Sequence, residues 1–228
     1  MKIYLKLFLI FLVIGVLGWA SYLYFTRTVK APSQAIINNN PINLQSSGEE
    51  TRNLFKITAD SQAQYNIGEV LNGNPFLVIG LTNQVFGDFI LDQENPANTK
   101  INKITINART FKTDNERRDA AVARFILRSE DGDKEFIEFQ PQQINNLPVK
   151  FESGQSYNLN IMGDLTISGI TKQASFNMTA YFEQPGLIKI EGQGTVLYKD
   201  FGLAIPELPF LANVDEEVVL KINLTAKK

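Results

Sequence analysis

From residue 53 onward, apolar and polar residues alternate along most of the chain. In residues 55–60, 103–108, 175–182 and 218–226, an apolar side chain stands at nearly every second position. A period of two is typical of a β-strand with one face toward a core and the other toward water. Asn72-Gly73 is typical of a tight turn between two strands. Many such strands predict an antiparallel sandwich or closed barrel.

One segment breaks this alternation. In residues 114–127, Val122, Phe125 and Ile126 fall on one stripe at helical spacing. Thr113 or Asp114 can cap the start of such a helix. The sequence therefore predicts one short α-helix in an otherwise all-β domain.

The N-terminal residues show a third pattern. Residues 7–25 contain no charged residue, and as a helix they would extend about 28 Å, close to the thickness of a bilayer core. We therefore interpret residues 1–27 as an anchor that crosses the cytoplasmic membrane once, with the rest of the chain on the extracytoplasmic side. The alternative is a signal peptide cleaved after Ala20, which would give a secreted protein.

Residues 28–51 have no apolar periodicity and contain Pro32, Pro41 and a run of three asparagines. This composition is typical of a flexible linker. The expected organisation is thus an anchor or signal segment (1–27), a linker (28–51) and a β-domain (52–228).

The composition excludes several classes of function. The net charge is −2, so the chain lacks the basic footprint expected of a nucleic-acid-binding protein. It has neither cysteine nor histidine, which removes disulfides, thiolate metal sites and the commonest catalytic base. We therefore expect no enzyme, no metal site and no cofactor other than a bound lipid. The 44% hydrophobic content, with 16 phenylalanines, indicates a substantial apolar interior.

Five of the seven arginines fall between residues 109 and 128. Guanidinium groups bind phosphate or carboxylate in a bidentate manner. Arg109, Arg117 and Arg118 are therefore candidates for contacting the polar head of a ligand. The alternative is a solvated helix face, on which Asp114 and Arg118 form an i,i+4 ion pair.

Four blocks of sequence occur in order: FLVIGLTNQVFGDFILD (76–92), INARTFKTDNERRD (106–119), GDLTISGITK (163–172) and DFGLAIPELPFLANVDEEVVL (200–220). Together they resemble the YceI-like family of secreted bacterial proteins. The resemblance implies an eight-stranded, antiparallel, lipocalin-like barrel. It also implies a long apolar ligand, such as a polyisoprenoid, an isoprenoid quinone or a fatty-acid derivative. The histidine that members often carry in the opening strand is absent here.

Alternation alone does not separate a barrel filled by its own side chains from one that contains a tunnel, and by itself it favours the filled core. With the resemblance, a ligand tunnel becomes the better interpretation. Its walls would be the inward-facing apolar residues of the strands. These are Phe55, Ile57, Leu77, Ile79, Ile104, Ile106, Ile161, Leu165, Phe176, Met178, Ile190, Leu220 and Ile222.

Residues 201–210 are apolar and contain two prolines, a composition that excludes a regular central strand. We interpret this segment as a loop at the barrel mouth, with Phe201, Leu203, Ile205 and Phe210 available to admit ligand, to contact a membrane or to pack against a second subunit. The resemblance implies a homodimer as one such assembly.

These observations favour a membrane-anchored, extracytoplasmic binding protein that sequesters or carries an amphiphilic lipid inside the barrel. The alternative is a structural or interaction module, in which a filled barrel binds a protein partner through its mouth loops.

Overall fold

The computed structural model describes residues 13–19, 21–23, 27–33, 53–206 and 211–228. It divides into two compact units, Met1–Lys30 and Ala31–Lys228. In the first unit, residues 13–19 and 21–23 are helical. Within the described part of the chain, no helix combines the length and the apolar character needed to cross a membrane. The other residues of the predicted 7–25 span (7–12, 20, 24 and 25) lie outside the described residues.

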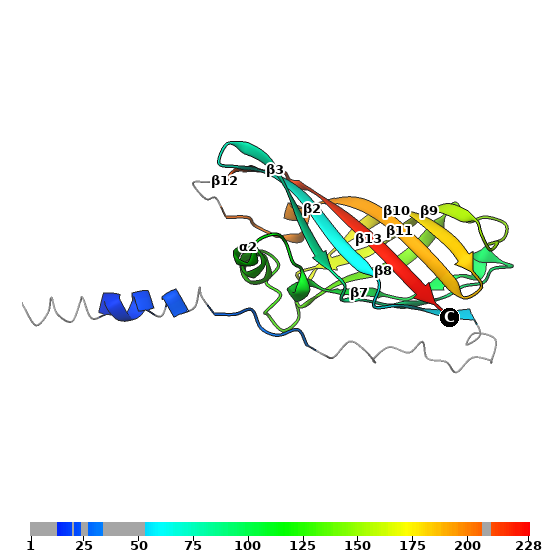
Figure 1. Cartoon of the computed structure of the whole chain (residues 1–228), viewed down its shortest axis with the longest axis horizontal. Coiled ribbons are helices and arrows are strands. Elements are labelled where there is room, and N and C mark those ends of the chain that lie inside the picture. The colour runs from blue at the N-terminus through cyan, green and yellow to red at the C-terminus, as the bar shows by residue number, and fades with distance from the viewer. Residues whose placement is uncertain (1–12, 20, 24–26, 34–52, 207–210) are drawn as a thin grey trace, which may run out of the picture. The chain divides into compact units, whose positions relative to one another are not determined.

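The second unit is mostly antiparallel β-sheet, curled into a barrel-like form (Figure 1). Seven strands have nine or more residues and six have four or fewer. The strands are β1 (Leu54–Ile57), β2 (Gln62–Leu71), β3 (Asn74–Thr82), β4 (Val85–Phe86), β5 (Asp88–Ile90), β6 (Lys100–Ile101), β7 (Ile104–Asn107), β8 (Phe136–Asn145), β9 (Ser156–Ile167), β10 (Ile170–Gln184), β11 (Leu187–Leu197), β12 (Leu211–Val214) and β13 (Glu217–Lys227).

The all-β prediction is confirmed, but the described residues form thirteen strands in one sheet rather than eight. Local backbone geometry explains part of the difference. Gly87, with φ +158°, separates β4 from β5. The predicted Asn72-Gly73 turn is confirmed: both residues have positive φ, 51° and 80°, which is the requirement of a tight hairpin turn.

The strands β8, β9, β10, β11 and β13 pair in that order and form the continuous part of the sheet. Along its other edge, β13 pairs with two strands in turn. Its first half pairs with β2, where Leu220 lies opposite Tyr65, and its last residues pair with β1, where Lys227 lies opposite Lys56. This shared partner brings the first strands against the last one, so the sheet curls around an interior.

The helical segment lies at one end of the barrel, beside the β2–β3 hairpin and away from the C-terminus (Figure 1). It comprises α2 (Glu116–Ala121) and the π-helical turn η4 (Val122–Ile126). The predicted helix is confirmed, but its cap is neither Thr113 nor Asp114. The side chain of Asn115 accepts hydrogen bonds from the backbone N–H groups of Arg117 and Arg118, and it satisfies donors that a helix start leaves open.

The buried side chains of the barrel form two clusters. The larger one extends through the interior to η4 and includes Ile161, Leu165 and Phe176. The smaller one lies toward the β10–β11 turn and includes two stacked aromatic pairs. The rings of Phe55 and Phe89 stack at 5.5 Å between centroids, and those of Phe151 and Phe182 at 4.7 Å. We call this smaller group of buried side chains the aromatic cluster.

Candidate ligand-binding cavity

A narrow cavity runs through the interior of the barrel. It has about 140 Å³ of open volume within about 1280 Å³ of space not filled by atoms, its openings to solvent included. All but three of its lining residues are apolar; the exceptions are Gln64, Thr99 and Lys221. Along β9 the lining extends from Leu159 to Ile167, which is about 26 Å of strand at about 3.3 Å per residue. A long and slender ligand fits this shape better than a compact one.

Most of the predicted wall residues lie where the alternation of the strands placed them. Ten of the thirteen line the cavity: Ile57, Ile104, Ile106, Ile161, Leu165, Phe176, Met178, Ile190, Leu220 and Ile222.

The other three predicted wall residues do not line this cavity. Phe55 is buried, but it packs in the aromatic cluster and does not line the cavity. Leu77 and Ile79 expose 54% and 40% of their surface, while Val78 between them exposes 3%. Residues 76–79 are four consecutive apolar residues, so the sequence carries no alternation there from which to assign the inner face.

The sequence reasoning also missed several aromatic wall residues. Phe111 and Phe151 lie in connecting segments, where no strand period applies. Phe139 and Phe182 lie on β8 and β10 and also line the cavity. Phe182 continues the alternation of Phe176 and Met178, so the sequence did contain a signal for this residue.

Tyr65 lies at the α2 end of the cavity. It follows the lining residue Ala63 on the same face of β2, and its ring meets Phe111 edge to face at 5.2 Å between centroids. The ring crosses Gly80 of β3, where an added Cβ would come within 2.1 Å of it. Its hydroxyl is buried and has no hydrogen-bond partner among the described residues. Burial and then the charge of Asp119 raise the pKa of Tyr65 to about 12, so the hydroxyl stays protonated.

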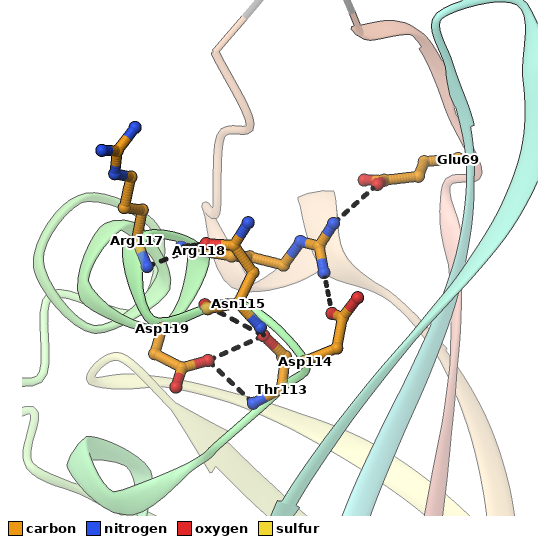
Figure 2. A network of polar contacts seen from close by, with 7 residues as sticks. All are labelled: Glu69, Thr113, Asp114, Asn115, Arg117, Arg118 and Asp119. Carbon is orange, nitrogen blue, oxygen red and sulfur yellow. Dashed lines mark hydrogen bonds and ion pairs between the residues drawn. The ribbon is translucent and has the colours of Figure 1, made fainter.

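Figure 2 shows two of the predicted head-group arginines, Arg117 and Arg118, in the first turn of α2. The Arg118 guanidinium pairs with Glu69, 3.1 Å away, and with Asp114. It also lies over the ring of Phe76, 5.4 Å from the centroid. The Arg117 side chain is exposed and points away from the network. The charge of Arg118 is therefore already neutralised, and Arg117 is the one of these two that faces solvent.

Asp119 anchors the start of α2 to the segment before it. Its carboxylate accepts hydrogen bonds from the backbone N–H and from the hydroxyl of Thr113, both at 2.7 Å. The residue is buried, with 7% of its surface exposed. These bonds hold a negative charge close to Tyr65.

Arg109 is buried in an ion pair. Its guanidinium lies 3.1 Å from the carboxylate of Glu135, and both side chains are 7% exposed. It also donates to the carbonyl oxygens of Ser129 and Ala31. The structure thus places Arg109 in a position that stabilises the fold. Ala31 lies within the predicted 28–51 linker, of which residues 34–51 lie outside the described residues.

The predicted mouth loop is partly a core element. Phe201 closes the short 3₁₀ turn η5 (Tyr198–Phe201) and is only 2% exposed, so it does not belong to an exposed loop. Leu203 and Ile205 are half-buried, and Phe210 lies outside the described residues. Among the described residues, no group of three or more acidic side chains is placed to hold a metal ion.

Comparison with known proteins adds the family. The model of the YceI-like domain matches residues 56–226, three quarters of the chain. The chain belongs to the YceI-like domain family. Among solved structures, this YceI-like fold is similar to a polyisoprenoid-binding domain from Saccharophagus degradans, with a TM-score of 0.60 and 10% identity, covering 76% of this chain and 97% of that one.

Two further solved structures have a similar fold. BcnA from Burkholderia cenocepacia has a TM-score of 0.59 and 18% identity, with 75% of this chain and 99% of that one covered. The YceI protein of Campylobacter jejuni has a TM-score of 0.50 and 17% identity, with 63% and 81% covered. At these identities the likeness establishes the fold. No curated protein matches the sequence.

Proposed function

We propose that this YceI-like protein binds the apolar chain of one amphiphilic lipid inside its barrel and sequesters or carries it. The lipid would be a polyisoprenoid, an isoprenoid quinone or a fatty-acid derivative. The observation that carries the proposal is the long, narrow and almost wholly apolar cavity. The similarity of the fold to a polyisoprenoid-binding domain from Saccharophagus degradans supports the same class of ligand.

The cavity wall favours recognition by shape and length. Burial of apolar groups gains about 0.8 kcal/mol per CH₂, so one five-carbon isoprene unit would contribute about 4 kcal/mol before the cost of ordering the chain. The lining residues that carry polar groups are Gln64, Thr99 and Lys221. The ligand would therefore be selected mainly by the dimensions of its chain.

The polar head would make few direct contacts. Arg109 and Arg118 are paired with carboxylates of the same chain, and a charged pair of this kind does not offer a free anion site. Of the three candidates, Arg117 is the exposed one and remains our proposal for contact with a charged head.

We also propose that the protein acts without catalysis. The described lining of the cavity is apolar except for Gln64, Thr99 and Lys221, so it holds no carboxylate that could orient or activate a nucleophile. The uncharged segment 7–25 would anchor the protein in the cytoplasmic membrane, with the barrel on the extracytoplasmic side. Anchoring favours local handover of lipid over long-range transport.

Native mass spectrometry of the full chain purified from bacterial membranes tests this function. We expect a population with one bound apolar molecule, identified as an isoprenoid or acyl lipid after extraction. The control is the variant Met178→Trp, which narrows the cavity in its middle and should lose the bound mass. A protein that carries no lipid, and that also fails to bind an added fluorescent fatty acid, contradicts the proposal.

A further inference from the structure

Residues 31–33 are fixed to the α2 end of the barrel by the ion pair of Arg109 and Glu135. Arg109 donates from Nη1 to the carbonyl oxygen of Ala31 at 2.8 Å. The backbone N–H of Ser33 donates to Oε1 of Glu135 at 2.7 Å. We call these four residues the N-terminal clamp.

The clamp is built into the core of the domain. The amide of Asn107, which is 1% exposed, also donates to Oε1 of Glu135 at 2.9 Å. Arg109 in turn donates to the carbonyl of Ser129 through Nε, at 3.0 Å. Charge-assisted bonds with buried partners are stronger than exposed ones, so Ala31 and Ser33 are held by groups that are themselves fixed.

The clamp shortens the effective tether between barrel and anchor. Five residues separate Phe25, the last residue of the uncharged run, from Ala31, and the six steps from Phe25 to Ala31 span at most about 21 Å when fully extended. A free linker over residues 28–51 would instead reach about 80 Å. The α2 end of the barrel must therefore stay close to the membrane surface if residues 7–25 are embedded.

This same end carries exposed apolar side chains. They lie on β3, on η4 and at the ends of β10 and β11 that meet η5. The start of β10 lies beside η4, because the hydroxyl of Ser168 in the β9–β10 turn donates a hydrogen bond to the carbonyl oxygen of Leu127. The residues are Phe76, Leu77, Ile79, Phe125, Ile170 and Leu197, each 37–54% exposed.

We propose that this end of the barrel rests on the lipid bilayer through its exposed apolar side chains and that the N-terminal clamp sets this orientation. The inference rests on the membrane anchor proposed above. The charges at the α2 end of the barrel favour insertion of apolar groups over attraction to anionic lipid. Exposed cations such as Lys112 and Lys199 are accompanied there by exposed acids such as Asp114 and Glu216. The orientation would place the α2 end of the cavity against the membrane that supplies the lipid.

Depth-dependent fluorescence quenching tests the orientation, and the absence of cysteine makes every single-cysteine label unique. The full chain is placed in phosphatidylcholine vesicles that contain a nitroxide lipid. Leu77→Cys carries the label at the proposed surface, and Val149→Cys, 96% exposed at the opposite end, is the matched control. We expect several-fold stronger quenching at position 77 than at position 149.

Two variants of Ser33 test the clamp without touching the barrel. Ser33→Pro removes the backbone N–H that donates a hydrogen bond to Glu135, whereas Ser33→Ala keeps it. We expect Ser33→Pro to lower the quenching at position 77 toward that at position 149, and Ser33→Ala to leave it unchanged, with the same thermal unfolding temperature in both.

Three results would overturn the inference. The first is equal quenching at positions 77 and 149 in the protein with an intact clamp, and the second is a Ser33→Pro variant that behaves like Ser33→Ala. The third is a label at position 77 that is shielded from aqueous quencher but not reached by lipid quencher, which would indicate a protein partner instead. Lipid binding in the cavity is measured separately by native mass spectrometry. If the chain fails to float with the vesicles, the anchor itself is disproved.

Discussion

Substituting Ala63 by phenylalanine provides a direct test of whether the barrel interior holds usable space. Ala63 lies on β2, is 2% exposed and lines the cavity. The added ring would extend into the space that we assign to the ligand chain. A filled core and an open tunnel respond to this change in opposite directions.

The two cases predict changes of opposite sign in the free energy of unfolding. In an open cavity, burial of a phenylalanine side chain gains about 1.5–3 kcal/mol, which offsets the cost of ordering it, so we expect the free energy of unfolding to stay equal or to rise. In a filled core, overpacking lowers it by about 1–3 kcal/mol. The ring would displace about one isoprene unit, which weakens lipid binding by about 4 kcal/mol, or roughly a thousandfold.

Thermal unfolding and titration with a fluorescent fatty acid measure the two effects. Ala226→Phe is the matched control, because Ala226 is also a buried strand alanine, at 0% exposure, but does not line the cavity. We expect Ala226→Phe to be destabilised and to bind normally in its folded fraction. If Ala63→Phe is destabilised as much as the control and binds fatty acid unchanged, the tunnel interpretation is refuted.

Three further predictions follow from the polar groups. The pKa of Tyr65 is about 12 in the folded protein against 10.0 ordinarily. The stability that comes from keeping the Tyr65 hydroxyl protonated is therefore complete below pH 10 and falls by about 2–3 kcal/mol as the pH rises toward 12. Denaturant titrations should show this loss in the wild type but not in Tyr65→Phe. Glu135→Gln leaves the buried Arg109 charge unpaired and should lower the free energy of unfolding by about 3–5 kcal/mol. Asp114→Asn, whose side chain is 62% exposed, should change it by less than about 1 kcal/mol in the same assay.

How far the sequence predicts the cavity depends on the local pattern. Where the strands alternate strictly, as at Phe176 and Met178, the inner face is assigned correctly. Where apolar residues run together, as at Leu77 and Ile79, the period of two disappears and the assignment failed. Phe111 could not have been found by this method, because it lies in a connecting segment and reaches the cavity through the fold.

The arginines show a second limit. Their composition suggested an anion site, yet their partners are set by long-range contacts that the sequence does not display. Glu135 is 26 residues from Arg109, and Glu69 is 49 residues from Arg118. A local i,i+4 pair with Asp114 was predicted and is present. The clamp on Ala31 was unexpected for the same reason, since the segment looked like a linker in composition alone.

Photo-crosslinking with a lipid that carries a diazirine in the middle of its chain tests the central claim most directly, because it reports where the ligand lies. After irradiation of the full-length protein, peptide mass spectrometry identifies the modified residues. The account predicts crosslinks at wall residues from several strands, such as Ile161, Met178 and Leu220, and their loss in Ala63→Phe. Crosslinks confined to outward-facing residues such as Leu77, with none inside the barrel, would contradict it and favour a filled barrel that interacts through its surface.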